Sequence, residues 1–417
     1  MTSSSREILL VSSPEGLITA YDASSGMIVA HFTSSRSPRK GLALVGNNLI
    51  AASHVSPDTA SGSIHLYNWW SPIAFHHLSV PEPVAPLAAT PDGLYLFCGG
   101  LSGNIHALML PSRDLFRSFP AHSKPVTCLT INDDASLLIS GGDDGAICIF
   151  PILGLLDTAC NDTAQFSLYQ FDAHLSSVTA TSIGTGGSNT TIISCSLDCT
   201  CKLWNLAYGT HVRTILFPCM IWGFVMDPTE TDFYVGGSDG RIYAGVLKVN
   251  RRELLNTDSG VVAWAPENDR AITAVAIANG GVNLVSASED GTVRIWDTKS
   301  GQVIRIFAHE RGSISDIAIV KGLRDSRGGH DFGLGGSGVE WGGQGLGFSG
   351  REIGRPVREL SHMEEMLSIV VKDRRRAIDR LEAAIGTYQR LLGLILKEAK
   401  GGGTDSNNSS KDKAAEM

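Results

Sequence analysis

Short apolar runs separated by tight polar turns repeat along most of the chain. Three segments superimpose directly, namely SGGDDGAICIF at 140–150, SCSLDCTCKLW at 194–204 and SASEDGTVRIW at 286–296. In each segment two apolar runs flank an acidic turn, whose Asp-Gly or Asp-Cys pair suits a tight hairpin. A further β-forming run precedes each segment, VTCLTI at 126–131, VTATSI at 178–183 and ITAVAI at 272–277. The pattern predicts a repeated unit of antiparallel strands.

Three weaker copies follow the same plan. Their first runs begin at Gly41, Ala85 and Ile221, and their hairpins lie around Ser61-Gly62, Ser102-Gly103 and Asp239-Gly240. Successive copies are about 40 to 50 residues apart, which is the period of a WD-repeat propeller blade. Parallel β-helices and leucine-rich repeats have shorter periods. We therefore predict an all-β propeller.

The two ends of the repeat region each supply part of one further unit. The chain opens with a lone hairpin, 8–13 and 17–22, and the repeat region closes with a lone strand, 315–320. Seven inner strands match seven hairpins only if these two parts join in one sheet. Such a junction removes the free sheet edges that favour aggregation, so we predict a seven-bladed ring closed by its N-terminal strands.

A set of polar and aromatic residues recurs at fixed places in the best copies. It comprises His122, Ser140, Asp144 and Phe150 in one copy, His174, Ser194, Asp198 and Trp204 in the next, Ser286, Asp290 and Trp296 in a third, and Asp239 in a decayed one. This set resembles the His-Ser/Thr-Asp-Trp set of the WD-repeat family. The resemblance implies a buried hydrogen-bonded relay that locks each blade, with every polar group partnered.

A Ser-His-Asp trio also occurs in hydrolases. Here the trio recurs in several copies, and the chain has neither a G-x-S-x-G turn nor a recognisable oxyanion loop. We therefore favour the structural reading and expect no catalytic residue, no cofactor and no metal site. A zinc site at Cys195, Cys199 and Cys201 lacks a fourth ligand at suitable spacing, and we expect the cysteines to be reduced thiols.

The C-terminal part of the chain has a different pattern. We divide the chain into a propeller at 1–322, a glycine-rich loop at 323–355, an amphipathic helix at 356–400 and a disordered polar tail at 401–417. The helix carries apolar residues at heptad spacing, typical of a coiled coil. Its stripe comprises Leu360, Met363, Leu367, Val370, Val371, Ile378, Leu381, Ile385, Tyr388, Leu391, Leu392 and Ile395. Because such a helix is not stable alone in water, we expect it to pair with a second copy or with a partner helix.

Charge is distributed unevenly along the chain. The net charge is -8, and residues 1–350 carry 21 basic against 31 acidic side chains. Nucleic-acid affinity depends mainly on Lys and Arg, so we expect RNA contact to be indirect at most. No run of about 18 apolar residues occurs, and we expect a protein that is neither secreted nor membrane-spanning.

Whole segments of the chain resemble the WD-repeat subunit of the rixosome, the nuclear complex that matures the pre-60S ribosomal particle. They are GLALVGNNLIAASH, SASEDGTVRIWD and, most specifically, the degenerate copy at 215–243. The resemblance implies a scaffold that binds a helical-repeat partner rich in Pro, Glu and Leu and a HEAT-like subunit. It further implies association with the AAA ATPase midasin and the pre-60S particle, a role in removing the internal transcribed spacer ITS2, and a location in the nucleolus and nucleoplasm.

A substrate receptor of a cullin-type ubiquitin ligase is the alternative function. Those receptors resemble this chain in their repeats but usually carry Trp-Asp-x-Arg at blade ends. Here the corresponding segments read Trp296-Asp297-Thr298-Lys299 and Trp204-Asn205-Leu206-Ala207. The arginine is missing in both.

Overall fold

The computed structural model describes residues 7–33, 35–46, 49–55, 62–156, 167–184, 190–247, 260–264, 270–309 and 312–321. All of them lie within Met1–Gly328. The expected glycine-rich loop, association helix and polar tail lie outside the described residues. Within the described ranges, no helix is long and apolar enough to cross a membrane.

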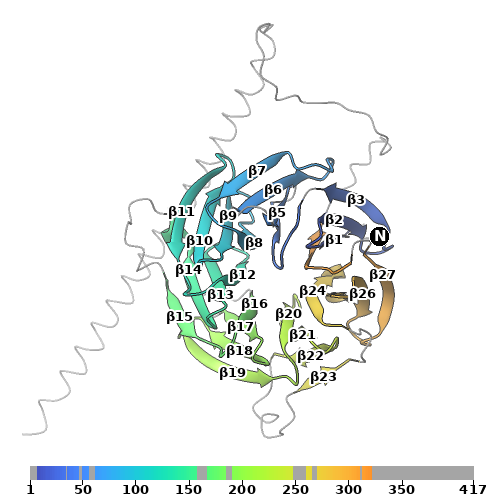
Figure 1. Ribbon diagram of the computed structural model, residues 1–417. Helices are drawn as coiled ribbons and strands as arrows, with labels where there is room; N and C mark the ends of the chain where they lie inside the picture. The colour runs from blue at the N-terminus through green and yellow to red at the C-terminus, as the bar shows by residue number, and fades with distance from the viewer. Residues whose placement is uncertain are drawn as a thin grey trace, which may run out of the picture. The chain divides into compact units, whose positions relative to one another are not determined.

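Seven four-stranded antiparallel sheets form the blades of a β-propeller and are arranged around a central axis (Figure 1). Blade 1 contains β28 (Asp316–Lys321), β1 (Glu7–Ser12), β2 (Leu17–Asp22) and β3 (Ile28–Thr33). Blade 2 contains β4 (Leu42–Val45), β5 (Leu49–Val55), β6 (Gly62–Asn68) and β7 (His76–Val80). Blade 3 contains β8 (Val84–Ala89), β9 (Tyr95–Gly100), β10 (Asn104–Met109) and β11 (Asp114–Pro120).

The remaining blades follow in chain order. Blade 4 contains β12 (Val126–Ile131), β13 (Leu137–Gly142), β14 (Ala146–Pro151) and β15 (Tyr169–Asp172), with the short helix α1 (Ile152–Leu156) after β14. Blade 5 contains β16 (Val178–Ile183), β17 (Thr191–Ser196), β18 (Thr200–Asn205) and β19 (Thr210–Leu216). Blade 6 contains β20 (Ile221–Met226), β21 (Asp232–Gly237), β22 (Ile242–Val246) and β23 (Val261–Ala263). Blade 7 contains β24 (Ile272–Ala278), β25 (Asn283–Ser288), β26 (Thr292–Asp297) and β27 (Val303–Ala308), with a 3-10 turn at Asn279–Gly281.

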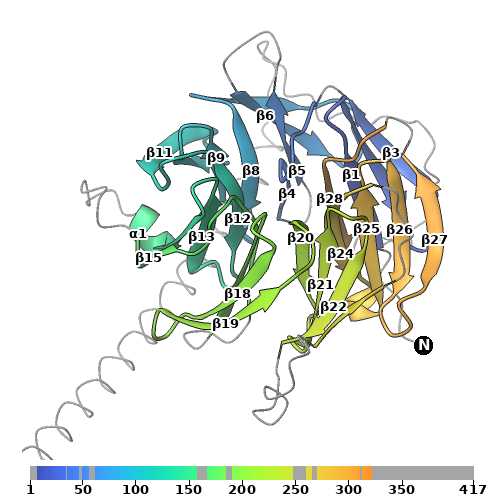
Figure 2. The ribbon, with the colours of Figure 1, turned by 60° about the horizontal axis from the view of Figure 1, so that its bottom comes forward.

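The ring closes through the N-terminal strands, as the sequence predicts. Strand β1 pairs with β28 in antiparallel register, with Leu10 opposite Ala318 and Ser12 opposite Asp316. The first strand of each blade contacts the first strand of the next blade, and β28 contacts both β24 and β4. Figure 2 shows β28 beside β1 at this junction. The closure joins residues about 300 positions apart in the chain.

Apolar side chains fill the spaces between neighbouring blades. One cluster joins blades 2 and 3 through Ile64 and Leu96, and another joins blades 7 and 1 through Val285 and Leu9. All four of these side chains are fully buried. Because each blade buries one face against each neighbour, no single blade has a core of its own. The propeller therefore holds its loops on a rigid frame.

One long-range contact crosses the ring. Arg39, in the segment between β3 and β4, donates a hydrogen bond to the Thr273 carbonyl on β24 over 2.6 Å. Its guanidinium also lies 4.1 Å from the centroid of the Trp222 ring on β20. Burial lowers the pKa of Arg39 to about 10, with the charges of Asp316 and Glu289 opposing the shift, so the side chain stays protonated at neutral pH. This segment thereby ties blade 2 to blades 6 and 7.

Candidate functional site

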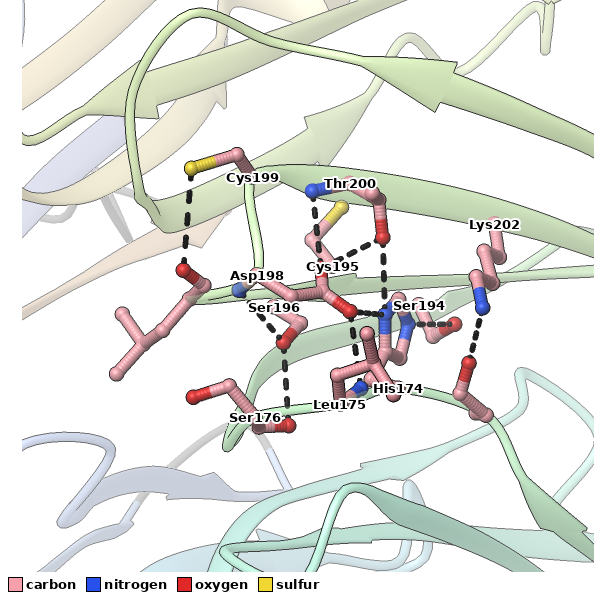
Figure 3. A network of polar contacts seen from close by, with 12 residues as sticks. His174, Leu175, Ser176, Ser194, Cys195, Ser196, Asp198, Cys199, Thr200 and Lys202 are labelled. Atoms are coloured by element: carbon pink, nitrogen blue, oxygen red, sulfur yellow. Dashed lines mark hydrogen bonds and ion pairs between the residues drawn. The ribbon is translucent and has the colours of Figure 1, made fainter.

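Four residues of blade 5 form the most complete polar network in the described part of the chain, and Figure 3 shows three of them, His174, Ser194 and Asp198. His174 lies in the segment before β16, and its Nδ1 is 3.0 Å from Asp198 Oδ2. Its Nε2 is 2.8 Å from Ser194 Oγ on β17. The Trp204 indole on β18 donates to the same hydroxyl over 3.0 Å. The network therefore joins a loop, a turn and two strands.

The turn between β17 and β18 determines the position of the Asp198 carboxylate. This carboxylate accepts backbone N–H bonds from Thr200 over 3.0 Å and from Leu175 over 3.1 Å. The second bond reaches the segment next to His174, so the carboxylate bridges two loops. Cys199, the next residue in the turn, has φ of 65°, a left-handed conformation that favours glycine. Gly145 has this conformation at the corresponding place in blade 4, where a Cβ would also collide with the His174 carbonyl oxygen.

Blade 4 repeats the arrangement with one difference. His122 Nδ1 lies 3.1 Å from Asp144 Oδ1, and its Nε2 lies 2.8 Å from Ser140 Oγ. Asp144 also accepts the backbone N–H of Ser123 over 2.9 Å. Phe150 occupies the position that Trp204 has in blade 5, and its ring has no N–H to donate. The hydroxyl of Ser140 therefore lacks the indole donor that Ser194 has.

Burial determines the protonation of these networks. It lowers the pKa of His174, and the charge of Asp198 opposes this effect without reversing it. Burial also opposes ionisation of Asp198, but hydrogen bonds from Thr200 and the charge of His174 together lower the pKa of this carboxyl. At neutral pH the pair is therefore a carboxylate and a neutral imidazole. We assign the Nδ1 proton of His174 to the bond with Asp198, so that Nε2 accepts the hydroxyl proton of Ser194.

The distances in blades 4 and 5 match those of a Ser-His-Asp triad. The surroundings differ from those of a nucleophile, because Ser140 and Ser194 are both fully buried. In blade 5 the Ser194 hydroxyl also accepts the Trp204 indole N–H, a bond that uses an oxygen lone pair that a nucleophile would need. The arrangement can hold a loop against a sheet, but it leaves no space for a substrate at the hydroxyl.

Blades 6 and 7 contain parts of the set. In blade 7 the Trp296 indole donates to Ser286 Oγ over 2.8 Å. Asp290 accepts the Thr292 backbone N–H within its own turn. In blade 6 the phenol of Tyr243 donates to Asp239 over 2.7 Å. The sequence analysis places Ser286, Asp290, Trp296 and Asp239 in the set, and the structure brings each to the same turn or strand as in blade 5. Tyr243 was not among the predicted residues.

Blade 3 contains a network that sequence reasoning missed. Glu82, in the segment before β8, lies 2.9 Å from His106 Nε2 and 2.5 Å from Ser102 Oγ. His106 Nδ1 is 2.7 Å from Ser118 Oγ on β11. The acid thus comes from the loop before the first strand and the imidazole from the third strand, whereas in blade 5 this loop supplies the imidazole and the turn supplies the acid. The sequence does contain a signal for this network. His106 follows Ser102 of the turn by four residues, and Tyr243 follows Asp239 by the same number in blade 6.

Two of the cysteines, Cys195 and Cys201, are not reduced thiols. Cys195 on β17 and Cys201 on β18 face each other in the register and form a disulfide. The expectation that all cysteines are reduced is therefore wrong for this pair, because the tight hairpin places the two residues directly opposite each other. Within the described ranges, no group of three or more His, Cys, Asp or Glu side chains could hold a metal ion.

Comparison with known proteins agrees with the repeat and the fold. The family model described as WD domain, G-beta repeat, matches residues 113–150, 165–205 and 264–297. Protein ROOT INITIATION DEFECTIVE 3 of Arabidopsis thaliana is 36% identical over 320 residues, 75% of this chain and 72% of that protein. WD repeat-containing protein 18 of Homo sapiens is 31% identical over 245 residues, 58% of this chain and 56% of that protein. The match therefore spans just over half of the human relative.

A fungal relative carries a functional name. Pre-rRNA-processing protein crb3/ipi3 of Schizosaccharomyces pombe is 25% identical over 322 residues, 69% of this chain and 71% of that protein. Three observations thus agree: a seven-bladed ring, polar sets of the WD-repeat kind, and relatives that match along most of the propeller. The chain therefore belongs to the WD-repeat family of ROOT INITIATION DEFECTIVE 3, WD repeat-containing protein 18 and crb3/ipi3, the family of the rixosome WD-repeat subunit.

Proposed function

We propose that this protein is a non-catalytic scaffold subunit of a nuclear complex that matures pre-60S ribosomal particles and processes pre-rRNA at ITS2. The observation that carries the proposal is the similarity to a pre-rRNA-processing protein along about two thirds of both chains. We place its activity in the nucleolus and nucleoplasm, where pre-rRNA processing takes place.

The chemistry of the propeller supports a scaffold. The side chains of its Ser-His-Asp sets form hydrogen bonds with one another inside the propeller, and the Ser140 and Ser194 hydroxyls are fully buried. We propose that these networks lock the blades, because a buried polar group without a partner destabilises a fold. A rigid ring with loops on two faces offers several surfaces for partners at once.

The resemblance to the rixosome WD-repeat subunit supports a particular set of partners. We propose that the chain joins a helical-repeat subunit rich in Pro, Glu and Leu and a HEAT-like subunit, and accompanies a midasin-type AAA ATPase on the pre-60S particle. The heptad stripe of 356–400, around Leu381 and Leu391, would supply the association element. Self-association and pairing with a partner helix both use this stripe.

The charge of the propeller supports an indirect relationship to RNA. Residues 1–350 carry ten more acidic than basic side chains, 31 against 21. A negatively charged surface repels the phosphate groups of RNA, and RNA binding depends mainly on Lys and Arg. We therefore propose that other subunits contact the pre-rRNA.

Affinity purification of the full chain from nuclei tests the proposal. The tagged protein should recover the helical-repeat and HEAT-like subunits together with pre-60S proteins. A matched bait ending at residue 322 keeps the propeller and removes the helix, and it should recover fewer of these partners. Recovery of cullin adaptors in place of pre-ribosomal proteins would contradict the proposal and favour the ubiquitin-ligase alternative.

A further inference from the structure

A disulfide crosses the base of the hairpin that carries Asp198. Cys195 on β17 and Cys201 on β18 are directly opposite each other in the register, with their Cα atoms 4.2 Å apart. Both residues are fully buried. The other cysteines in the described part of the chain are free thiols, namely Cys98, Cys128, Cys148, Cys199 and Cys219. The bond therefore lies within one hairpin and links no two blades.

The disulfide and the polar network lie on opposite faces of this hairpin. Successive side chains of a strand point to opposite faces of its sheet. Cys195 and Cys201 pack in the apolar cluster between blades 5 and 6. Ser194, the residue before Cys195, forms its hydrogen bond with His174 on the other face. Two separate sets of bonds therefore hold the same hairpin.

The fold accommodates the cysteine pair in both oxidation states. Backbone pairing of β17 with β18, for example of Ile193 with Leu203, keeps the two cysteines opposite each other whether or not the sulfurs are joined. Free cysteines are among the residues most often buried in proteins, so two thiols suit the apolar cluster. The network of His174 still holds the hairpin when the disulfide is reduced. Reduction should therefore loosen the turn without unfolding the blade.

The turn that the disulfide closes also holds a surface loop. Asp198 lies midway between the two cysteines in the chain. Its carboxylate accepts the backbone N–H of Leu175 over 3.1 Å and that of Thr200 over 3.0 Å (Figure 3). Leu175, in the loop before β16, is 98% exposed. A disulfide restricts the loop that it closes, so this one restrains Asp198 and, through it, the loop of Leu175.

We propose that Cys195 and Cys201 form a reversible thiol–disulfide switch that sets the mobility of the loop at 173–177. In the dithiol state the turn of Asp198 and this loop open more often than in the disulfide state. Oxidation takes one hydrogen from each thiol and forms the S–S bond. The two electrons and two protons pass to oxidised glutathione, which becomes two molecules of the reduced thiol.

The burial of both sulfurs determines how this exchange takes place. Cys195 and Cys201 have no exposed surface, so a small thiol or disulfide reaches them only when the hairpin opens locally. The switch does not depend on which complex contains the protein.

Thiol labelling of the full chain tests whether the pair changes state. The protein is equilibrated in glutathione buffers that range from fully reduced to fully oxidised, then denatured and treated with a thiol-blocking mass label. Peptides covering 194–204 should pass from labelled to bridged as the oxidised fraction rises and return when it falls. Cys199 in the same peptide is the internal reference, because its thiol is free. A pair that stays bridged, or stays labelled, in every buffer would overturn the proposal.

Hydrogen exchange measured by mass spectrometry tests the effect on the loop. Dithiothreitol should raise the exchange rates of the amides at 173–177 and 197–200 at least about threefold in the wild-type chain. Cys195→Ala together with Cys201→Ala should give the faster exchange with and without dithiothreitol. The turn at 101–103 in blade 3 provides the internal reference, since β9 and β10 carry no disulfide.

Cys199→Ser is the matched control. It removes the free thiol of the same turn and leaves the disulfide in place, so the response to dithiothreitol should persist. Melting curves check that each variant folds. Loop exchange that dithiothreitol leaves unchanged in the wild-type chain would overturn the proposal. Loss of the response in Cys199→Ser would also overturn it, because the effect would then belong to Cys199.

Discussion

The indole N–H of Trp204 donates a hydrogen bond to Ser194 Oγ over 3.0 Å, and both residues are buried in blade 5. The same hydroxyl lies 2.8 Å from His174, so one serine links the third strand of the blade to the loop before its first strand. Asp198 completes the set from the turn. Residues of the same types as a catalytic triad here form hydrogen bonds between a loop, a turn and two strands of one blade.

Replacing Asp198→Ala should destabilise the propeller by roughly 1 to 3 kcal/mol, because buried donors lose their acceptor. The affected donors are His174 Nδ1, the Thr200 hydroxyl and the backbone N–H groups of Leu175 and Thr200. Denaturant unfolding measures the effect. Asp133→Ala, an exposed carboxylate in another turn, is the control and should change stability little. Wild-type stability of the Asp198 variant would contradict a locking role.

Stability should fall as the pH decreases below about 6.5. The pKa of His174 is lowered from its ordinary value of 6.5 in the folded state, mainly by burial, so the unfolded chain binds more protons in this range. Where the unfolded state binds more protons, stability rises with pH and is lost on acidification. His122 is shifted in the same direction. Unfolding curves between pH 7.5 and 5 check the slope, which His174→Gln should reduce; an unchanged slope would mean that His174 titrates normally.

Deleting residues 1–22 should open the ring. The deletion removes β1 and β2, leaving β28 without its partner strand and exposing a sheet edge that favours aggregation. Size-exclusion chromatography with light scattering distinguishes the outcomes. We expect aggregated or expanded protein, whereas a monodisperse truncation with unchanged melting would show that the ring does not need its N-terminal strands.

The Leu381→Asp and Leu391→Asp double variant should lose assembly and keep a folded propeller. Both leucines belong to the heptad stripe. Burying charged side chains in such a seam costs enough free energy to dissociate a coiled coil. Light scattering and recovery of nuclear partners provide the readouts. The double replacement Glu382→Asp and Gln389→Asp, beside the stripe, is the control. Unchanged assembly of the leucine variant would mean that the stripe is not the association element.

The repeat pattern predicted the ring more completely than the sites. Short apolar runs and the tight turns between them, Asp-Gly, Ser-Gly or Asp-Cys, indicate the hairpins locally. The lone hairpin and the lone strand at the two ends of the repeat region imply the closure between β1 and β28. The network of Glu82 and His106 was missed because the loop residue is here an acid and the imidazole lies on the third strand, so that the acid precedes the histidine in the chain. The contact of Arg39 with Trp222 was missed because it joins blades far apart in the sequence, and no local pattern encodes such a contact.

The level of ITS2-containing pre-rRNA in cells depleted of this protein tests the central proposal most directly. Northern hybridisation with an ITS2 probe measures the precursors, and re-expression of the full chain provides the rescue. We predict that precursors retaining ITS2 accumulate at least several-fold on depletion and return to normal on rescue, while 18S rRNA maturation continues. Unchanged ITS2 precursors in fully depleted cells would contradict a role in pre-60S maturation.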